Sequence, residues 1–154
     1  MQDVLILGGD GYLGWPTAMH LSSKGYNVTV VDNYFRRKAC TELNIKTLYE
    51  NFNLINRAKL WYQLTGYEIK VLIADLTDPE VIKNLLTNKT IYDWSINNSN
   101  SQTPSSVIHY AEQPSAPYSL MSQNKSEFTL LNNLKVTHNL IWAVKEFSVD
   151  THIV

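Results

Sequence analysis

The stretch Val4-Leu5-Ile6-Leu7-Gly8-Gly9-Asp10-Gly11-Tyr12-Leu13-Gly14 decides the fold of this chain. Its apolar run predicts a buried strand, and its glycines predict a turn that leads into a helix. Gly8 permits the turn, Gly11 lets the backbone approach a pyrophosphate, and Gly14 lets the helix lie close to the strand. The N–H groups at the start of that helix can then bind an anion. The first candidate cofactor-binding residues are therefore Gly8, Gly11, Tyr12, Leu13 and Gly14.

The glycine triplet alone is equally typical of an ordinary glycine-rich turn, and its context decides between the two interpretations. Residues 27–32 predict a second buried strand, which ends in Asp32. An acid about 20 residues beyond the glycines is expected to accept hydrogen bonds from the ribose of an adenosine. Strand, glycine turn, helix, strand and acid occur in the right order, so the pattern predicts nucleotide binding.

Composition excludes several other classes of function. The chain has 154 residues, of which 44% are hydrophobic and 18% charged, and its net charge is −1. These values predict a globular domain that attracts neither nucleic acid nor an anionic membrane surface. Cys40 is the only cysteine, so no internal disulfide or thiolate metal cluster is expected. The first strand begins near the N-terminus, and we expect a cytoplasmic protein without a targeting peptide, membrane span or metal.

Hydrophobic periodicity predicts alternating strands and helices. Further strands are expected at 69–73, 106–110 and 151–154, and helices at 15–24, 47–64 and 126–147, with a short helix opening at Pro79. Residues 33–44 and 97–106 are expected to be loops. The apolar side of the last helix is predicted to contain Leu130, Leu131, Leu134, Leu140, Ile141 and Val144.

This alternation predicts an α/β fold of the Rossmann type. Its doubly wound parallel sheet should have the strand order 3-2-1-4-5, with the ligand at the carboxyl ends of the first and fourth strands. Residues 1–154 would form one dinucleotide-binding domain that is truncated after its fifth strand, which would lie exposed at the edge of the sheet.

Three segments carry a resemblance to a known family. They are Gly8-Gly9-Asp10-Gly11-Tyr12-Leu13-Gly14-Trp15, Val31-Asp32-Asn33-Tyr34-Phe35-Arg36-Arg37 and Glu112-Gln113-Pro114-Ser115-Ala116-Pro117-Tyr118-Ser119. Together they resemble the UDP-sulfoquinovose synthases, which are extended short-chain dehydrogenase/reductase enzymes of the NAD-dependent epimerase/dehydratase class. The resemblance spans nearly the whole chain but less than half of a full-length family member.

The resemblance implies an enzyme that converts UDP-glucose and sulfite to UDP-sulfoquinovose. Bound NAD would oxidise C4 of the sugar, water would leave across C5 and C6, sulfite would add at C6, and the hydride would return to C4. It also implies a homodimer for the full-length enzyme. The family has an arginine where this chain has Pro114, so another NAD-dependent UDP-sugar epimerase or dehydratase stays open as an alternative.

The resemblance also assigns further site residues. Asp32 would favour NAD because an acid there repels the 2′-phosphate of NADP. The arginines next to it could instead bind that phosphate, but in this family they accompany NAD. The implied cofactor-binding residues beyond the glycine turn are Asp32, Asn33, Arg36, Arg37, Asp75, Leu76, Tyr110 and Ala111, with His109 left open between a cofactor-lining and a structural role. The implied substrate-binding residues are Glu112, Gln113, Ser115 and Tyr118.

No catalytic residue is assigned. Catalysis in this superfamily uses a Ser or Thr after the fifth strand and a Tyr-x-x-x-Lys on the next helix, and both are expected beyond Val154. Tyr34 and Lys38 have that spacing, but they follow Asp32 at the adenosine end, so no catalytic role is expected for them. A catalytically inactive NAD-binding module is therefore a second alternative.

Overall fold

Five parallel strands form the sheet of the computed structural model, which describes residues 2–46, 52–96, 102–113 and 116–154. The strand order is β3-β2-β1-β4-β5, which confirms the predicted doubly wound topology. Neighbouring strands pair in parallel throughout. The strands are β1 (Asp3–Leu7), β2 (Asn27–Asp32), β3 (Ile69–Ile73), β4 (Ser106–His109) and β5 (His152–Ile153).

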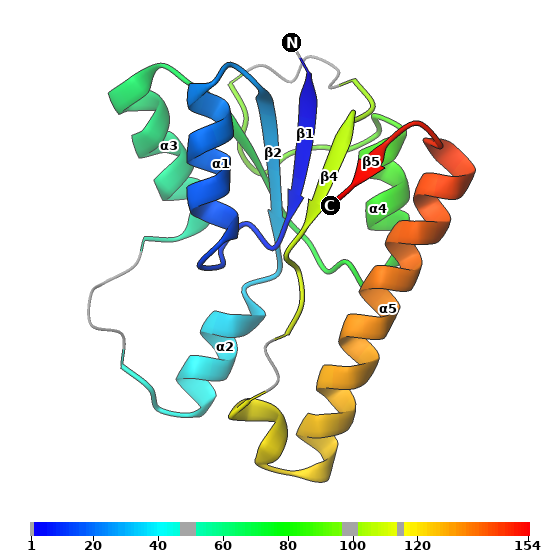
Figure 1. Ribbon diagram of the computed structural model, residues 1–154. Coiled ribbons are helices and arrows are strands. Elements are labelled where there is room, and N and C mark those ends of the chain that lie inside the picture. Colours follow the sequence, from blue (N-terminus) through cyan, green and yellow to red (C-terminus); the bar gives the residue numbers. More distant parts are fainter. Residues whose placement is uncertain (1, 47–51, 97–101, 114–115) are drawn as a thin grey trace.

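Helices cover both faces of the sheet (Figure 1). One face is covered by α1 (Gly14–Ser23) and α3 (Leu54–Thr65), and the other by α4 (Pro79–Leu86) and α5 (Gln123–Phe147). The short α2 (Phe35–Glu42) and the 3₁₀ turn η1 (Tyr118–Leu120) lie beyond the carboxyl ends of the strands.

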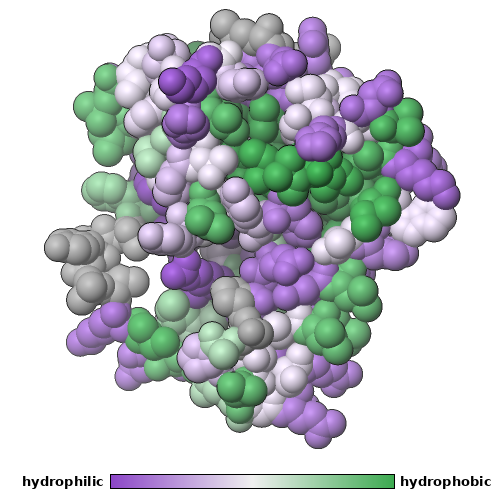
Figure 2. Space-filling model, viewed as in Figure 1, coloured by the Kyte–Doolittle hydropathy of each residue, from purple (hydrophilic) through white to green (hydrophobic). Residues whose placement is uncertain are grey.

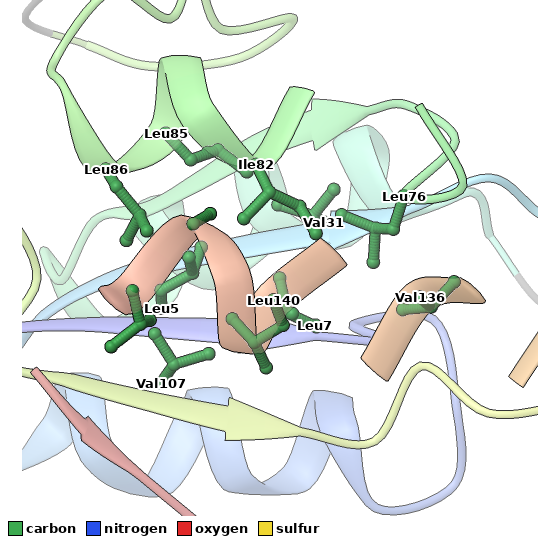
Figure 3. Packing of buried hydrophobic residues seen from close by; sticks show 12 residues of the cluster. Leu5, Leu7, Val31, Leu76, Ile82, Leu85, Leu86, Val107, Val136 and Leu140 are labelled. Atoms are coloured by element: carbon green, nitrogen blue, oxygen red, sulfur yellow. The ribbon is translucent and has the colours of Figure 1, made fainter. Parts of the chain in front are cut away.

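The alternation of side chains along β1 explains why its sequence is apolar throughout. Val4 and Ile6 pack on the cluster that contains Trp15 of α1, whereas Leu5 and Leu7 pack on the opposite cluster. Figure 3 shows that opposite cluster, in which side chains of the sheet meet those of α4 and α5. A strand buried on both faces needs apolar residues at every position.

Side-chain caps define the starts of three helices. Asn53 accepts a hydrogen bond from the N–H of Asn56, and Ser122 accepts one from the N–H of Lys125. Asp78 caps α4 in the same way, with Pro79 in its first turn. Caps of this kind each stabilise a helix by about 1 kcal/mol.

The predicted loop at 33–44 is wrong, because α2 occupies most of it. Only Ala39 of α2 is buried, so this helix has no apolar stripe that periodicity could detect. It is held by contacts with residues far along the chain. The ring of Phe35 stacks on Phe128 at 4.7 Å between centroids, and Glu42 pairs with Lys125 at 2.7 Å.

Two helix boundaries and one helix face also differ from the prediction. The helix predicted at 47–64 begins at Leu54, and residues 47–51 lie outside the described residues, as do 97–101 of the predicted polar loop. The last helix begins at Gln123 instead of 126. Of its predicted apolar side only Leu140 and Val144 are buried, whereas the exposed members are Leu130, Leu131, Leu134 and Ile141.

The exposed edge predicted for the fifth strand is confirmed. β5 lies at the end of the strand order, and both of its residues are exposed. Figure 2 shows apolar surface at the end of β5, where Ile153 and Val154 are exposed.

Candidate nucleotide-binding site

A cavity of about 490 Å³ opens at the carboxyl ends of the strands. The glycine turn after β1 and the segment after β4 both line it, and these two strands are neighbours in the sheet. The chain leaves β1 toward one side of the sheet and β4 toward the other, which makes this the switch point where open α/β sheets bind ligands. The surface is hollowed at this level, between the body of the domain and the part below it (Figure 2).

Two glycines of the turn have no room for a side chain. A Cβ on Gly8 would lie 2.6 Å from the carbonyl carbon of Tyr110, and Gly8 has a φ of +88°. A Cβ on Gly14 would lie 2.1 Å from the carbonyl oxygen of Gly8. A Cβ on Gly11 would meet only that same oxygen, at 3.2 Å. Gly8 and Gly14 are therefore required by packing, whereas Gly11 mainly keeps space free on the cavity side.

The first turn of α1 is available to an anion. The residue before the helix, Leu13, provides no side-chain cap, and no acidic residue of the described chain stands in the first turn. The N–H groups of a helix start that no side chain binds are open to a ligand, and the helix dipole favours a negative one. Tyr12 and Leu13 are exposed at the mouth of the cavity.

Asp32 is fixed at the end of β2 by backbone donors. Its Oδ2 accepts from the N–H of Asp10 at 2.9 Å, and its Oδ1 accepts from the N–H of Tyr34 at 2.8 Å. Burial raises the pKa of Asp32, although these two hydrogen bonds act in the opposite direction. Each carboxylate oxygen can accept a second hydrogen bond, so the group can still bind the hydroxyls of a ribose.

Asp10 forms an ion cluster with two arginines. Arg37 donates to it from Nε at 2.6 Å and from Nη2 at 2.8 Å, and Nη2 of Arg57 pairs with its Oδ1. The Asp10 side chain is only 6% exposed. The guanidinium of Arg57 also lies over the ring of Trp15, at 4.7 Å from the centroid. The cluster thus ties the glycine turn to α2 and α3.

His109 lines the cavity at the end of β4. Its Nε2 lies 3.2 Å from Oγ1 of Thr137, and its Nδ1 accepts from the N–H of Ala111 at 3.3 Å. Burial lowers the pKa of His109, and nearby Glu112 opposes that shift. A neutral ring with one donor and one acceptor fits these contacts.

The segment after β4 is attached to α5 by one asparagine. Oδ1 of Asn133 accepts from the N–H of Gln113 at 2.7 Å, and its Nδ2 donates to the Gln113 carbonyl at 3.0 Å. On the other side of the cavity, Asn139 donates to the carbonyls of Leu76 and Thr77, each at 3.1 Å. Two asparagines of one helix therefore fix two walls of the cavity.

The structure brings most of the predicted site residues together. The lining includes the following residues predicted for the cofactor or substrate: Gly8, Gly11, Tyr12, Leu13, Gly14, Asp32, Asn33, Arg36, Asp75, Leu76, Tyr110, Ala111, Glu112 and Gln113. His109 also lines the cavity. Ser115 lies outside the described residues.

Two predicted residues are placed elsewhere. Arg37 binds the carboxylate of Asp10, and the ring of Tyr118 packs edge-on against Phe35 at 5.6 Å. Sequence reasoning also missed several lining residues: Asp10, Phe35, Ala74, Asn132 and Val136. Asp10 lies within the glycine motif itself and carried a usable signal, because a charge inside such a turn needs a partner.

Tyr34 has a structural role. Its hydroxyl accepts from the N–H of Leu54 at 3.0 Å, which joins the end of β2 to the start of α3. Burial raises the pKa of Tyr34, which is the reverse of what a catalytic phenolate requires.

Neither a metal cluster nor a membrane helix is found. Across the described ranges, no group of three or more His, Cys, Asp and Glu side chains is arranged to hold a metal ion. None of the helices in those ranges combines the length and apolar character needed to cross a membrane.

Comparison with known proteins agrees with the motifs and the fold. The chain is 37% identical over 151 residues to the chloroplastic UDP-sulfoquinovose synthase of Spinacia oleracea, an alignment that covers 98% of this chain and 29% of that enzyme. It is 29% identical over 150 residues to the UDP-sulfoquinovose synthase of Sulfolobus acidocaldarius, covering 97% and 35%. The resemblance seen in the motifs is confirmed. No protein-family model matches the chain.

Solved structures share the fold. A UDP-glucose 4-epimerase of Stenotrophomonas maltophila, with bound NAD and formylated UDP-arabinopyranose, superposes with a TM-score of 0.65 at 19% identity, covering 95% of this chain and 34% of that one. The UDP-glucose 4-epimerase of Bifidobacterium longum, in complex with NAD⁺ and UDP, gives 0.64 at 24% identity and covers 96% and 35%. The chain thus spans about a third of the length of the relatives it matches and corresponds to part of an epimerase/dehydratase-family protein.

Proposed function

We propose that this chain is the NAD-binding part of a nucleotide-sugar-modifying enzyme similar to UDP-sulfoquinovose synthase. One observation carries the proposal: the uncapped start of α1 and the carboxylate of Asp32 line the same cavity at the switch point. The first suits a pyrophosphate and the second a ribose, which are adjacent groups of a dinucleotide. The relatives crystallised with NAD support the choice of cofactor.

Asp32 makes the proposal testable by calorimetry. Asp32→Ala removes an acceptor for the ribose hydroxyls and also removes the charge that repels a 2′-phosphate. NAD binding should therefore weaken by about ten-fold or more, as expected for lost hydrogen bonds to a charged group, and NADP binding should weaken less. Isothermal titration of both dinucleotides measures this difference. Equal losses for NAD and NADP would contradict the role of Asp32.

The segment after β4 supports a sugar nucleotide as substrate. Glu112 and Gln113 line the cavity next to Tyr110 and Ala111, so polar groups continue from the β4 end of the cofactor site. The Glu-Gln-x-Ser-Ala-Pro-Tyr-Ser motif is the segment that resembles the sugar-facing loop of the family. UDP-glucose is the substrate we propose, with sulfite as the second substrate.

This chain by itself should not carry out the oxidation step. The tyrosine hydroxyl of its one Tyr-x-x-x-Lys accepts a hydrogen bond from the backbone N–H of Leu54, which is a structural contact. Mixing the 154-residue protein with NAD and UDP-glucose should produce no reduced cofactor absorbance at about 340 nm, the band of reduced nicotinamide. An absorbance that grows with time would show that the residues present suffice for hydride transfer.

A UDP-sugar 4-epimerase is the second candidate. Pro114 favours it, because the resembled family has an arginine there that suits an anionic substrate. The enzyme purified from its native source distinguishes the two. A sulfonated nucleotide sugar formed from UDP-glucose and sulfite supports the synthase, whereas UDP-galactose formed without sulfite supports the epimerase. The same preparation gives the intact mass and shows whether the chain continues beyond 17.6 kDa.

The homodimer implied by the resemblance is part of the proposal for the full-length enzyme. The row of leucines on the outer side of α5 supports it, since Leu130 and Leu134 are 67% and 63% exposed. Apolar side chains that lie one helical turn apart form a continuous surface for a partner. Sedimentation of the native enzyme gives its subunit number, and a monomer would contradict this part of the proposal.

A further inference from the structure

The carboxylate of Asp10 occupies hydrogen-bond donors of two arginines, in addition to fixing the glycine turn. Its carboxylate receives both donors of the Arg37 fork and a third donor from Arg57. Arg37 also donates from Nη2 to the carbonyl of Phe52 at 2.8 Å. A planar guanidinium that binds one carboxylate through two nitrogens has used the geometry with which it would otherwise bind a phosphate.

The cluster lies one hydrogen bond away from the proposed ribose acceptor. The N–H of Asp10 donates to Oδ2 of Asp32, so the two carboxylates belong to neighbouring residues of one network. The charges of the network influence each other: the hydrogen bonds to Asp10, and to a smaller degree the charge of Asp32, raise the pKa of Arg37, whereas burial raises the pKa of Asp32 against the opposing charge of Arg57. Among the described residues, the network thus joins the carboxylates of Asp10 and Asp32 to the guanidinium groups of Arg37 and Arg57.

Asp10 is the carboxylate that binds both arginines. Arg57 has its charge over the ring of Trp15, and its Nε is buried without a hydrogen-bond partner among the described residues. Without the charge of Asp10, these two partly buried cations would lose the carboxylate that they share. An excess of partly buried positive charge is costly, and an incoming anion relieves that cost.

We propose that Asp10 is a specificity residue for the cofactor: by binding Arg37 and Arg57 it withholds both guanidinium groups from the 2′-phosphate of NADP. The proposal rests on the nucleotide site described above. Asp32 repels the phosphate directly, and Asp10 removes the cations that would otherwise attract it. Arg36 lines the cavity whether or not Asp10 is charged, so it does not contribute to the difference.

The test is Asp10→Asn, which keeps the size of the side chain and removes its charge. NAD, NADP, ADP and 2′,5′-ADP are titrated into the wild-type and variant proteins by calorimetry. We expect the ratio of NADP to NAD affinity to rise at least about ten-fold, and the ratio of 2′,5′-ADP to ADP affinity to rise equally, because each guanidinium adds charge-assisted hydrogen bonds to the phosphate. Unchanged ratios in a variant with a native circular dichroism spectrum would overturn the proposal.

Two further variants separate specificity from stability. Asp10→Asn combined with Arg37→Gln and Arg57→Gln removes the cations as well, and its ratio should return to the wild-type value. If a raised ratio persists there, the arginines are not the cause and the proposal fails. Should Asp10→Asn not fold, Asp10→Asn with Arg57→Met leaves a single arginine, and its ratio should still rise at least about three-fold; an unchanged ratio would again overturn the proposal. A wild-type protein that binds no NAD would instead reject the proposed function itself.

Discussion

The two ends of the cavity are built in opposite ways. At the end formed by the glycine turn and β2, polar groups are already bound: Asp10 holds two arginines, and Asp32 accepts two backbone N–H groups. At the end formed by the segment after β4, Glu112 is exposed and the first half of α5 presents leucines to solvent. The first end is organised before any ligand arrives, whereas the second has polar and apolar groups that no described residue covers.

The two ends of the cavity are stabilised differently: one by close backbone packing, and the other by the burial of one side of a helix. The glycine end depends on backbone atoms that approach closely, so Gly8 and Gly14 tolerate no added atom. The α5 end depends on a helix of which only one side is buried, so substitutions on its exposed side should leave the stability of the 154-residue chain nearly unchanged. The following predictions test where each kind of stabilisation applies.

The largest effect is expected at Gly8. In Gly8→Ala the new Cβ lies under 3 Å from three backbone atoms, at 2.6, 2.6 and 2.8 Å, in addition to the strain of a positive φ. We expect a loss of more than about 4 kcal/mol in the free energy of unfolding, which is the range of severe packing defects. Urea unfolding measures it.

Gly25→Ala is the matched control. Gly25 has almost the same φ, +87°, but a Cβ there meets no atom within 4 Å. It should cost only about 1–2 kcal/mol, the strain of a left-handed backbone. Equal losses of unfolding free energy for the two variants would show that the close backbone approach at Gly8 contributes nothing to the cost of Gly8→Ala.

The next effect compares two leucines of α5. Leu140 is 1% exposed and packs on the sheet, whereas Leu134 is 63% exposed. Leu140→Ala should destabilise the protein by about 3 kcal/mol, because it leaves a cavity in the core. Leu134→Ala should change stability by less than about 0.5 kcal/mol. A large loss for Leu134→Ala would mean that the outer side of α5 is covered in solution.

The smallest effect is the pH dependence from His109. Burial lowers its pKa in the folded state, so below the ordinary value of 6.5 the unfolded chain binds a proton that the folded chain does not. This contribution to stability is fully present above 6.5 and decreases as the pH falls toward the folded-state pKa. The melting temperature of the wild type should therefore fall more between pH 7.5 and 5.5 than that of His109→Gln. Parallel curves would contradict a buried, neutral His109.

Local patterns predicted the glycine end well and the α5 end poorly. The run before Gly8, the glycine spacing and Asp32 are signals within one βαβ unit, and they led to the correct strand order. The signals for this end required no knowledge of distant contacts.

The features that the sequence did not predict depend on contacts between residues far apart in the chain. α2 has no apolar stripe and is fixed by Phe128 and Lys125, which lie far along the chain. The ion pair between Arg37 and Asp10 joins residues 27 positions apart, so it could be identified only once both were placed in space. Leu130 and Leu134 fit helical periodicity, which cannot tell a side that packs on the sheet from one that does not.

The central claim is that a dinucleotide binds at the switch point between β1 and β4. Backbone amide NMR of the 154-residue protein, titrated with NAD, tests it most directly. The account predicts that the largest shifts occur at Gly11–Gly14, at Asp32 and Asn33, and at Tyr110 and Ala111. Little change is expected at Gly25 or Gly66, which precede β2 and β3 at the amino ends of the strands. Shifts centred on those amino ends, or no shifts at saturating NAD, would contradict it.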